Sequence, residues 1–492
     1  MNPNLNLVTT SALVLWPVAT LWLYSTRPIA KATLWTILGA YMLLPVAAEI
    51  KFPMIPALDK SSIPNLAALV GCWMCLKRPM RFWNGFGLPE LLIVTLLVSL
   101  FITSDLNGDQ LVYGSLVLPG VDLYDGGSAA IGQLIAFLPF FLGRQILRGS
   151  ADTEEILRVL IIAGLAYSLP ILLEVRMSPQ LHTWIYGYFP SQMFGQQIRD
   201  GGFRPVVFMG HGLLVAFFIM TTAVAAAAFW RTGTQVARTG RVTNSAITAY
   251  LCGMLILCKT VSSFVYGVFL VPLIRLTRPK LQMKIALALV VVALLYPTLR
   301  LAGFIPTRAL TELAESVSVD RAHSLEQRFD NEDALLNHAT QRFWFGWGRW
   351  GRSRVYDRWG QDISLLDGTW IITMGQFGFV GFATLFGLLA FPVFRAAAVL
   401  RHIRSGNESV FLAAVTLILA INIFDLLPNS PLRPWTWLLA GALLGRSEEL
   451  QAFARRQRVS SQSNQPPGPI AQPEGRTAPS LARRVQSHRA QQ

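Results

Sequence analysis

Long apolar stretches separated by short polar connectors recur along nearly all of this 492-residue chain. A helix needs roughly 20 apolar residues to cross the hydrocarbon core of a bilayer, and only helices and closed barrels satisfy their backbone polar groups there. Charged residues make up 14% of the chain, against about 25% in a soluble globular protein. The pattern predicts an all-α polytopic membrane protein with about 12–13 transmembrane helices.

The order of apolar and polar stretches predicts four regions. Residues 1–304 hold the first ten expected spans and an outward loop at 176–204, 305–368 form one long outward loop, and 369–446 hold the last spans. Residues 447–492 are poor in apolar side chains and are expected to be a disordered cytoplasmic tail. The expected spans lie near residues 8–24, 33–49, 63–76, 87–103, 128–147, 157–175, 205–230, 245–258, 261–275, 284–304, 369–394, 409–425 and 434–446.

The charge of the connectors predicts the orientation. Alternate connectors, at 27–31, 77–81, 144–148, 231–241, 275–284 and 395–404, are basic, whereas 104–127 contains no Lys or Arg. Lys and Arg are retained on the cytoplasmic side of short loops, while long loops cross regardless of charge. We therefore expect the N-terminus and the loops 176–204 and 305–368 to be extracytoplasmic and the C-terminus cytoplasmic.

The net charge of +15 has the same topological explanation, because basic residues gather in the tail and the connectors. No nucleic-acid partner is expected. The cysteine pair Cys72 and Cys75 has the C-x-x-C spacing, but no second ligand pair accompanies it and its surroundings are apolar. We interpret the cysteines as small buried thiols and expect no metal site or cofactor.

The long loop contains the largest polar stretch of the chain. Leu325, Phe329, Leu336 and Phe343 recur within it at helical spacing, which predicts an amphipathic helix. The glycines and tryptophans of 346–351 follow. Tryptophan suits the headgroup depth of a bilayer and equally suits stacking on sugar rings, so Trp347 is a candidate substrate-binding residue. The loop arginines are candidates for chemistry. The alternative is that they pair, in a solvated helical face, with the acids Glu312, Glu315, Glu326, Asp330, Glu332 and Asp333.

A second polar stretch, Gln197 to Leu213, precedes the expected span at 205–230. Pro205 suits the first position of a helix, which would place His211 about two turns inside the span. An ionisable residue at membrane depth suggests function, although a neutral histidine bonded to a neighbouring helix fits equally. For Arg204 the structural alternative is anchoring at the membrane surface.

Three motifs resemble those of the O-antigen ligase and polysaccharide polymerase superfamily of bacterial membrane glycosyltransferases. They are the Arg199–Pro205 segment, the Arg342–Gly348 segment with its Phe-Gly-Trp-Gly sequence, and Leu366–Trp370 followed by the glycines of 375–381. The family commonly has His-Asn where the loop enters the next span. This chain has Leu366-Asp367 instead, so the family histidine has no counterpart at that position.

The resemblance implies an inner-membrane enzyme that takes an undecaprenyl-diphosphate-linked glycan and a glycan acceptor at the periplasmic face, and it allows other polysaccharide-assembly proteins as partners. Arginines that hold the diphosphate would stabilise the leaving group without a metal or cofactor. Arg204, Arg342 and Asp367 are the expected catalytic residues, with Asp367 as the base, and Arg199, His211 and Trp347 the expected substrate-binding residues. A polymerase is preferred to a ligase. A flippase for the same lipid and a structural scaffold remain alternatives.

Overall fold

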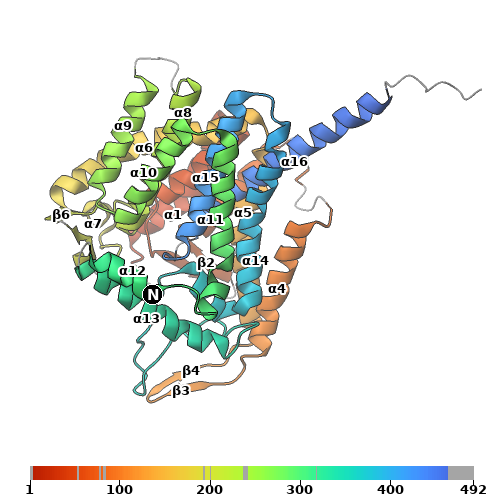
Figure 1. The fold of residues 1–492 in the computed structure, drawn as a ribbon. Helices are drawn as coiled ribbons and strands as arrows, with labels where there is room; N and C mark the ends of the chain where they lie inside the picture. The colour runs from red at the N-terminus through yellow and green to blue at the C-terminus, as the bar shows by residue number, and fades with distance from the viewer. Residues whose placement is uncertain are drawn as a thin grey trace, which may run out of the picture. The chain divides into compact units, whose positions relative to one another are not determined.

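The structure is a computed structural model that describes residues 4–52, 55–76, 79–80, 85–191, 194–199, 201–236, 242–316, 319–430 and 432–463. The chain divides into two units, Met1–Leu450 and Gln451–Gln492, and the first holds the helical bundle (Figure 1). Among the residues expected in the basic connectors, Lys77, Arg78, Arg81, Arg238 and Arg241 lie outside the described residues.

The architecture confirms an all-α polytopic membrane protein. Each of the thirteen apolar stretches overlaps a helix, and in the described part of the chain 8 helices are long and apolar enough to cross a membrane. The bundle helices are α1 (Leu7–Thr26), α2 (Ile29–Leu43), α3 (Ser62–Cys75), α4 (Leu88–Asp105), α5 (Leu123–Ile146), α6 (Ser150–Met177), α8 (Gly212–Thr232), α9 (Asn244–Leu257), α10 (Val261–Leu276), α11 (Pro279–Leu301), α14 (Thr369–Val399), α15 (Gly406–Asp425) and α16 (Pro434–Ser463).

Short elements occupy the connections between these helices. The expected amphipathic helix of the long loop is present as α13 (Val319–Thr340), preceded by α12 (Thr307–Glu315). The strands form three antiparallel pairs. They are β1 (Glu49–Phe52) with β2 (Ile55–Asp59), β3 (Leu111–Tyr113) with β4 (Leu116–Leu118), and β5 (Ile198–Arg199) with β6 (Gly202–Phe203); α7 (Leu181–Tyr186), η1 (Phe194–Gln197) and η2 (Leu400–His402) complete the described elements.

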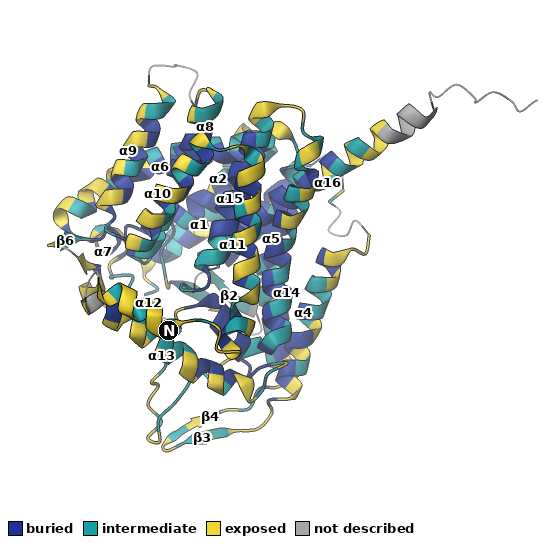
Figure 2. Ribbon diagram, in the orientation of Figure 1, coloured by how far each residue is buried: buried dark blue, intermediate teal, exposed yellow. Residues whose placement is uncertain are grey.

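The centre of the bundle is formed by α8 and α15. Of an 18-residue apolar stretch in each helix, 83% is buried in α8 and 22% in α1. Figure 2 shows the buried residues concentrated in the inner helices. Small side chains let membrane helices approach closely, and the alanines of 223–228 in α8 are all buried. This packing places the start of α8 next to the end of α15, and the charged cavity described below lies there.

The end of α16 differs from the expected start of the tail. The helix continues to Ser463, although disorder was expected from residue 447. Glu448, Glu449, Arg455 and Gln457 are good helix formers, so helix propensity extends the helix beyond its apolar part. Residues 464–492 of the expected tail lie outside the described residues.

The helix α14 is broken at Gly378, whose φ of 65° is not helical. The segment 343–348 of the long loop lies against this break. Backbone N–H groups of Phe379 and Val380 donate to the carbonyls of Phe343 and Trp344 at 2.7 and 3.2 Å, and Trp347 N–H donates to Gly375 O at 2.8 Å. The loop therefore supplies the partners that the break would leave without hydrogen bonds.

Candidate functional site

The segment between β6 and α8 is an irregular loop whose backbone is hydrogen-bonded to a buried acid. Glu174 of α6, only 1% exposed, accepts hydrogen bonds from the N–H groups of Val206 and Val207, both at 2.7 Å. The Tyr167 hydroxyl accepts from Phe208 N–H at 3.1 Å. These partners replace the helical hydrogen bonds that the segment would otherwise form.

Because of this clamp, α8 begins at Gly212 and not at Pro205. The prediction that Pro205 starts the helix and that His211 lies two turns inside it is therefore wrong. His211 is the N-cap residue, and its Nδ1 accepts from Leu213 N–H at 3.1 Å. The error has a tertiary cause, since Glu174 lies about thirty residues away in the sequence and has no local signal.

Arg204 is held where the irregular loop passes the start of α8. Its backbone N–H donates to Gln197 O at 2.7 Å, its guanidinium donates to Lys259 O at 3.4 Å, and the residue is 8% exposed. A Cβ on Gly212 would lie 2.0 Å from Arg204 Cδ. The side chain can take this path only because residue 212 is glycine.

Residues of both predicted outward loops line one cavity of about 600 Å³. Four of the six predicted site residues line it, namely Arg199, Arg204, His211 and Asp367. Sequence reasoning missed three further charged residues of its wall: Arg328 from α13, Asp425 at the end of α15, and Arg433 just before α16. The cavity is the candidate functional site.

The signal for two of these residues was present in the chain. Asp425 and Arg433 flank a short connector between two apolar stretches, and this connector falls on the side that the charge pattern assigns as extracytoplasmic. An arginine in such a short outward connector departs from the positive-inside pattern. Arg328 has no such signal in the sequence, because arginines are common on the exposed face of amphipathic helices.

Arg433 is the cavity residue whose positive charge a bound anion would stabilise most. Among the described residues no carboxylate lies within ion-pair distance of it, and its Nε has no hydrogen-bond partner. Its guanidinium lies 5.5 Å from the ring centroid of Tyr41. Burial lowers the pKa of Arg433 from its usual value, yet a guanidinium remains protonated in proteins. A bound anion would compensate this buried charge.

His211 is neutral at physiological pH. Burial, and then the positive charge of Arg204, lower its pKa to about 4, although Asp367 acts in the opposite direction. Nδ1 is already used as an acceptor at the helix cap, so Nε2 carries the hydrogen and faces Gln196 Oε1 at 3.4 Å. In this arrangement His211 offers the cavity a hydrogen-bond donor and no free basic nitrogen.

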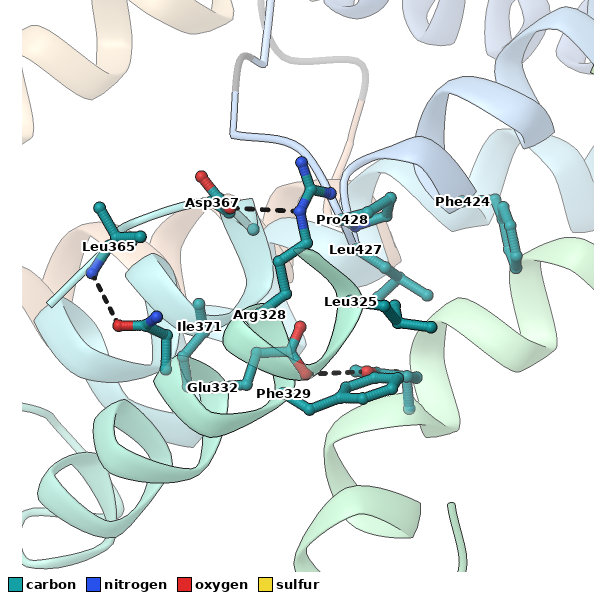
Figure 3. Close-up of a pocket in the computed structure, with 13 residues that line it drawn as sticks. Leu325, Arg328, Phe329, Glu332, Leu365, Asp367, Ile371, Phe424, Leu427 and Pro428 are labelled. Carbon is teal, nitrogen blue, oxygen red and sulfur yellow. Dashed lines mark hydrogen bonds and ion pairs between the residues drawn. The ribbon is translucent and has the colours of Figure 1, made fainter. Parts of the chain in front are cut away.

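Asp367 forms an ion pair across the cavity wall. Its Oδ2 lies 3.6 Å from Arg328 Nε, and both side chains are roughly half exposed. Figure 3 shows this pair beside an apolar pocket of about 200 Å³, whose other labelled walls include Leu325, Phe329 and Phe424. Arg328 and Asp367 line both this pocket and the larger cavity, so the pair lies at the boundary between an apolar and a charged compartment.

The structure does not bring Arg342 and Trp347 into this cavity. Arg342 Nη2 lies 3.2 Å from Asp109 Oδ2, and the guanidinium lies over the Trp347 ring at 4.3 Å from its centroid. The fully buried Arg352 pairs with the other oxygen of Asp109 at 3.0 Å. Trp347 stacks on His338 at 4.4 Å. These contacts fasten the long loop to the connector 106–110 between α4 and β3.

The loop arginines also have other partners than the expected ones. Besides Asp109 and Asp367, the acid Asp362 pairs with Arg354, whereas Glu332 and Asp333 pair with Arg300 of α11. The pairing alternative therefore holds for several arginines, but through acids outside the expected helical face.

No family model matches the chain, and no curated protein matches it either.

Proposed function

We propose that this chain is a glycosyltransferase of the bacterial inner membrane that polymerises glycan units carried on undecaprenyl diphosphate at the periplasmic face. The observation that carries the proposal is the charged cavity. Arg199, Arg204, Arg328 and Arg433 face Asp367 and Asp425 there, beside the neutral His211. The wall thus has an excess of positive charge that suits a dianionic group.

The chemistry of glycosyl transfer from a lipid diphosphate matches these side chains. An acceptor hydroxyl attacks the anomeric carbon, the bond from that carbon to the diphosphate breaks, and the diphosphate leaves with the electron pair. Guanidinium groups directed at the leaving oxygens stabilise this charge, and their planar fork fits phosphate oxygens. Arg204, which is 8% exposed, and Arg433, whose Nε is buried without a hydrogen-bond partner, are best suited to the role.

The origin of the charged residues supports an enzyme over a transporter. Transporters place ionisable groups along several spans near the middle of the membrane. The charged cavity residues come instead from the loop segments around 199–211 and 324–367 and from the helix ends near 425 and 433. A ligase would use the same groups with another acceptor, so it stays the alternative to a polymerase.

The test is Arg204→Ala in a strain that depends on this protein for its surface polysaccharide. Loss of one preorganised donor to a developing charge costs about 100-fold or more in rate, so chain extension should be lost while the protein inserts normally. Arg204→Lys should also be poor, because an ammonium does not reproduce the fork. Gel analysis of polysaccharide length gives the readout.

Arg349→Ala is the matched control, because this exposed arginine of the long loop lies over the Trp350 ring and forms no ion pair in the described part of the chain. Normal long-chain polysaccharide in Arg204→Ala would refute the proposal. Deletion of the gene then separates the alternatives. Single glycan units on the lipid indicate a polymerase, full-length polymer on the lipid a ligase, and material trapped at the cytoplasmic face a flippase.

A further inference from the structure

The acid Asp425 occupies the inner end of the cavity. It is the last residue of α15, and it lines both the charged cavity and a smaller chamber of about 50 Å³ that continues between α8, α15 and α16. Its Oδ1 accepts from Asn429 Nδ2 at 2.9 Å. A neutral donor thus orients the carboxylate.

Asp425 and Asp367 differ in what surrounds their carboxylates. Asp367 is paired with Arg328 and half exposed, so a guanidinium already engages its carboxylate. No lysine or arginine of the described chain forms an ion pair with Asp425. The Asp425 carboxylate can therefore accept the hydrogen of an incoming hydroxyl without first leaving an ion pair.

We infer that Asp425 is the general base of the transfer, in place of the carboxylate at the loop exit, and this inference rests on the proposed function. The acceptor hydroxyl gives its proton to the Asp425 carboxylate as its oxygen bonds to the anomeric carbon. The electron pair of the breaking bond leaves on the diphosphate, which the arginines hold. Asp367 then acts through Arg328, which it orients, and is a positioning residue.

The groups that face Asp425 come from several elements, and each affects its titration. Asn429 donates to it, and Tyr266 of α10 lies near it. Arg328 of α13 acts on it through its charge, and Tyr41 of α2 and Arg433 share its inner chamber. The positive groups support the carboxylate in its ionised form at neutral pH, and the neutral donor Asn429 leaves it able to accept a proton.

The experiment compares Asp425→Asn with Asp367→Asn in purified full-length protein. The glycan donor is the lipid-linked material extracted from the deletion strain, and farnesyl diphosphate serves as a separate binding probe for the arginines. A general base contributes about 100-fold or more to the rate. We expect Asp425→Asn to lose at least this much kcat with nearly unchanged binding of farnesyl diphosphate, and Asp367→Asn to lose far less.

Two further measurements distinguish a base from a structural residue. The residual kcat of Asp425→Asn should lose the acid limb of the wild-type pH profile, and formate should restore part of the turnover of Asp425→Ala. If Asp425→Asn keeps wild-type kcat, or if formate fails to restore Asp425→Ala while Asp367→Asn shows the large loss, the inference is overturned. Failure of the proposed function is separate, because the purified wild-type protein would then give no turnover of the lipid-linked glycan.

Discussion

At the scale of single residues, Gly212 decides where the key arginine lies. The Arg204 side chain runs across the start of α8 through space that a Cβ at position 212 would occupy, with Cγ and Cδ of the arginine 2.2 and 2.0 Å from that Cβ. These are atoms in the middle of the side chain, so they cannot avoid the clash by a small movement of the end group. The proposed activity should therefore depend on Gly212, which acts only through the position of Arg204.

We predict that Gly212→Ala lowers chain extension without lowering stability. Alanine suits the first turn of a helix better than glycine does, so the fold is kept while Arg204 must adopt another rotamer. A displacement of about 1 Å in a reacting constellation can cost about 100-fold in rate. Polysaccharide length and the thermal unfolding midpoint in detergent are the two measurements.

Gly253→Ala in α9 is the control for this substitution, because nothing lies within 4 Å of a Cβ there. It should leave both measurements unchanged or raise the unfolding midpoint slightly. A Gly212→Ala variant that extends polysaccharide normally would show that Arg204 does not need its observed path.

At the scale of elements, the break in α14 and the 343–348 segment form one unit. Each supplies hydrogen-bond partners that the other needs, and the Arg342–Asp109 pair fastens the start of the segment. Two of the three motifs that resemble polysaccharide polymerases thus contact each other here. Their contact attaches the long loop, and Asp367 is the residue of these two motifs that also lines the charged cavity.

We predict that Gly378→Ala destabilises the protein by about 2 kcal/mol or more, since a left-handed backbone conformation strains most L-residues. A Cβ at this position would also lie 2.3 Å from the backbone carbon of Trp344. The thermal unfolding midpoint should fall, together with the protection of the long loop against limited proteolysis.

The comparison is Gly387→Ala, farther along the same helix, where the nearest atom lies at an ordinary 3.5 Å from the added Cβ. Gly387→Ala should behave like wild type in both assays. Equal stability of the two variants would contradict the interpretation of the break as an attachment point.

At the scale of the whole molecule, the charge pattern of the connectors predicts which end of the bundle faces outward. We expect a cysteine at the exposed position Gln327, beside the cavity, to react with a membrane-impermeant maleimide in intact cells. A cysteine at the exposed position Ala151, next to the basic connector 144–148, should react only after permeabilisation. The background is a variant in which Cys72, Cys75, Cys252 and Cys258 are replaced by alanine, and the opposite labelling pattern would reverse the proposed orientation.

The sequence was sufficient for the elements and for about half of the site. Apolar length decides helix formation in a membrane, so every expected span falls on a helix. Arg199, Arg204, His211 and Asp367 were found because charge beside a membrane segment is conspicuous. The start of α8 and the convergence of Arg328, Asp425 and Arg433 depend on contacts between distant segments, such as the Glu174 clamp. Spacing along the chain does not encode those contacts.

The residues that attach the long loop differ from most of those that line the cavity, and this affects how the cavity could change during evolution. Residues 343–348 and the Arg342–Asp109 pair hold the loop, whereas Ser324, Gln327 and Leu365 are among the loop residues that face the cavity. These three positions can thus vary without releasing the loop. Chimeras that exchange only these positions offer a route to new acceptor preferences on an unchanged scaffold, in the way that antibody frameworks carry different binding loops.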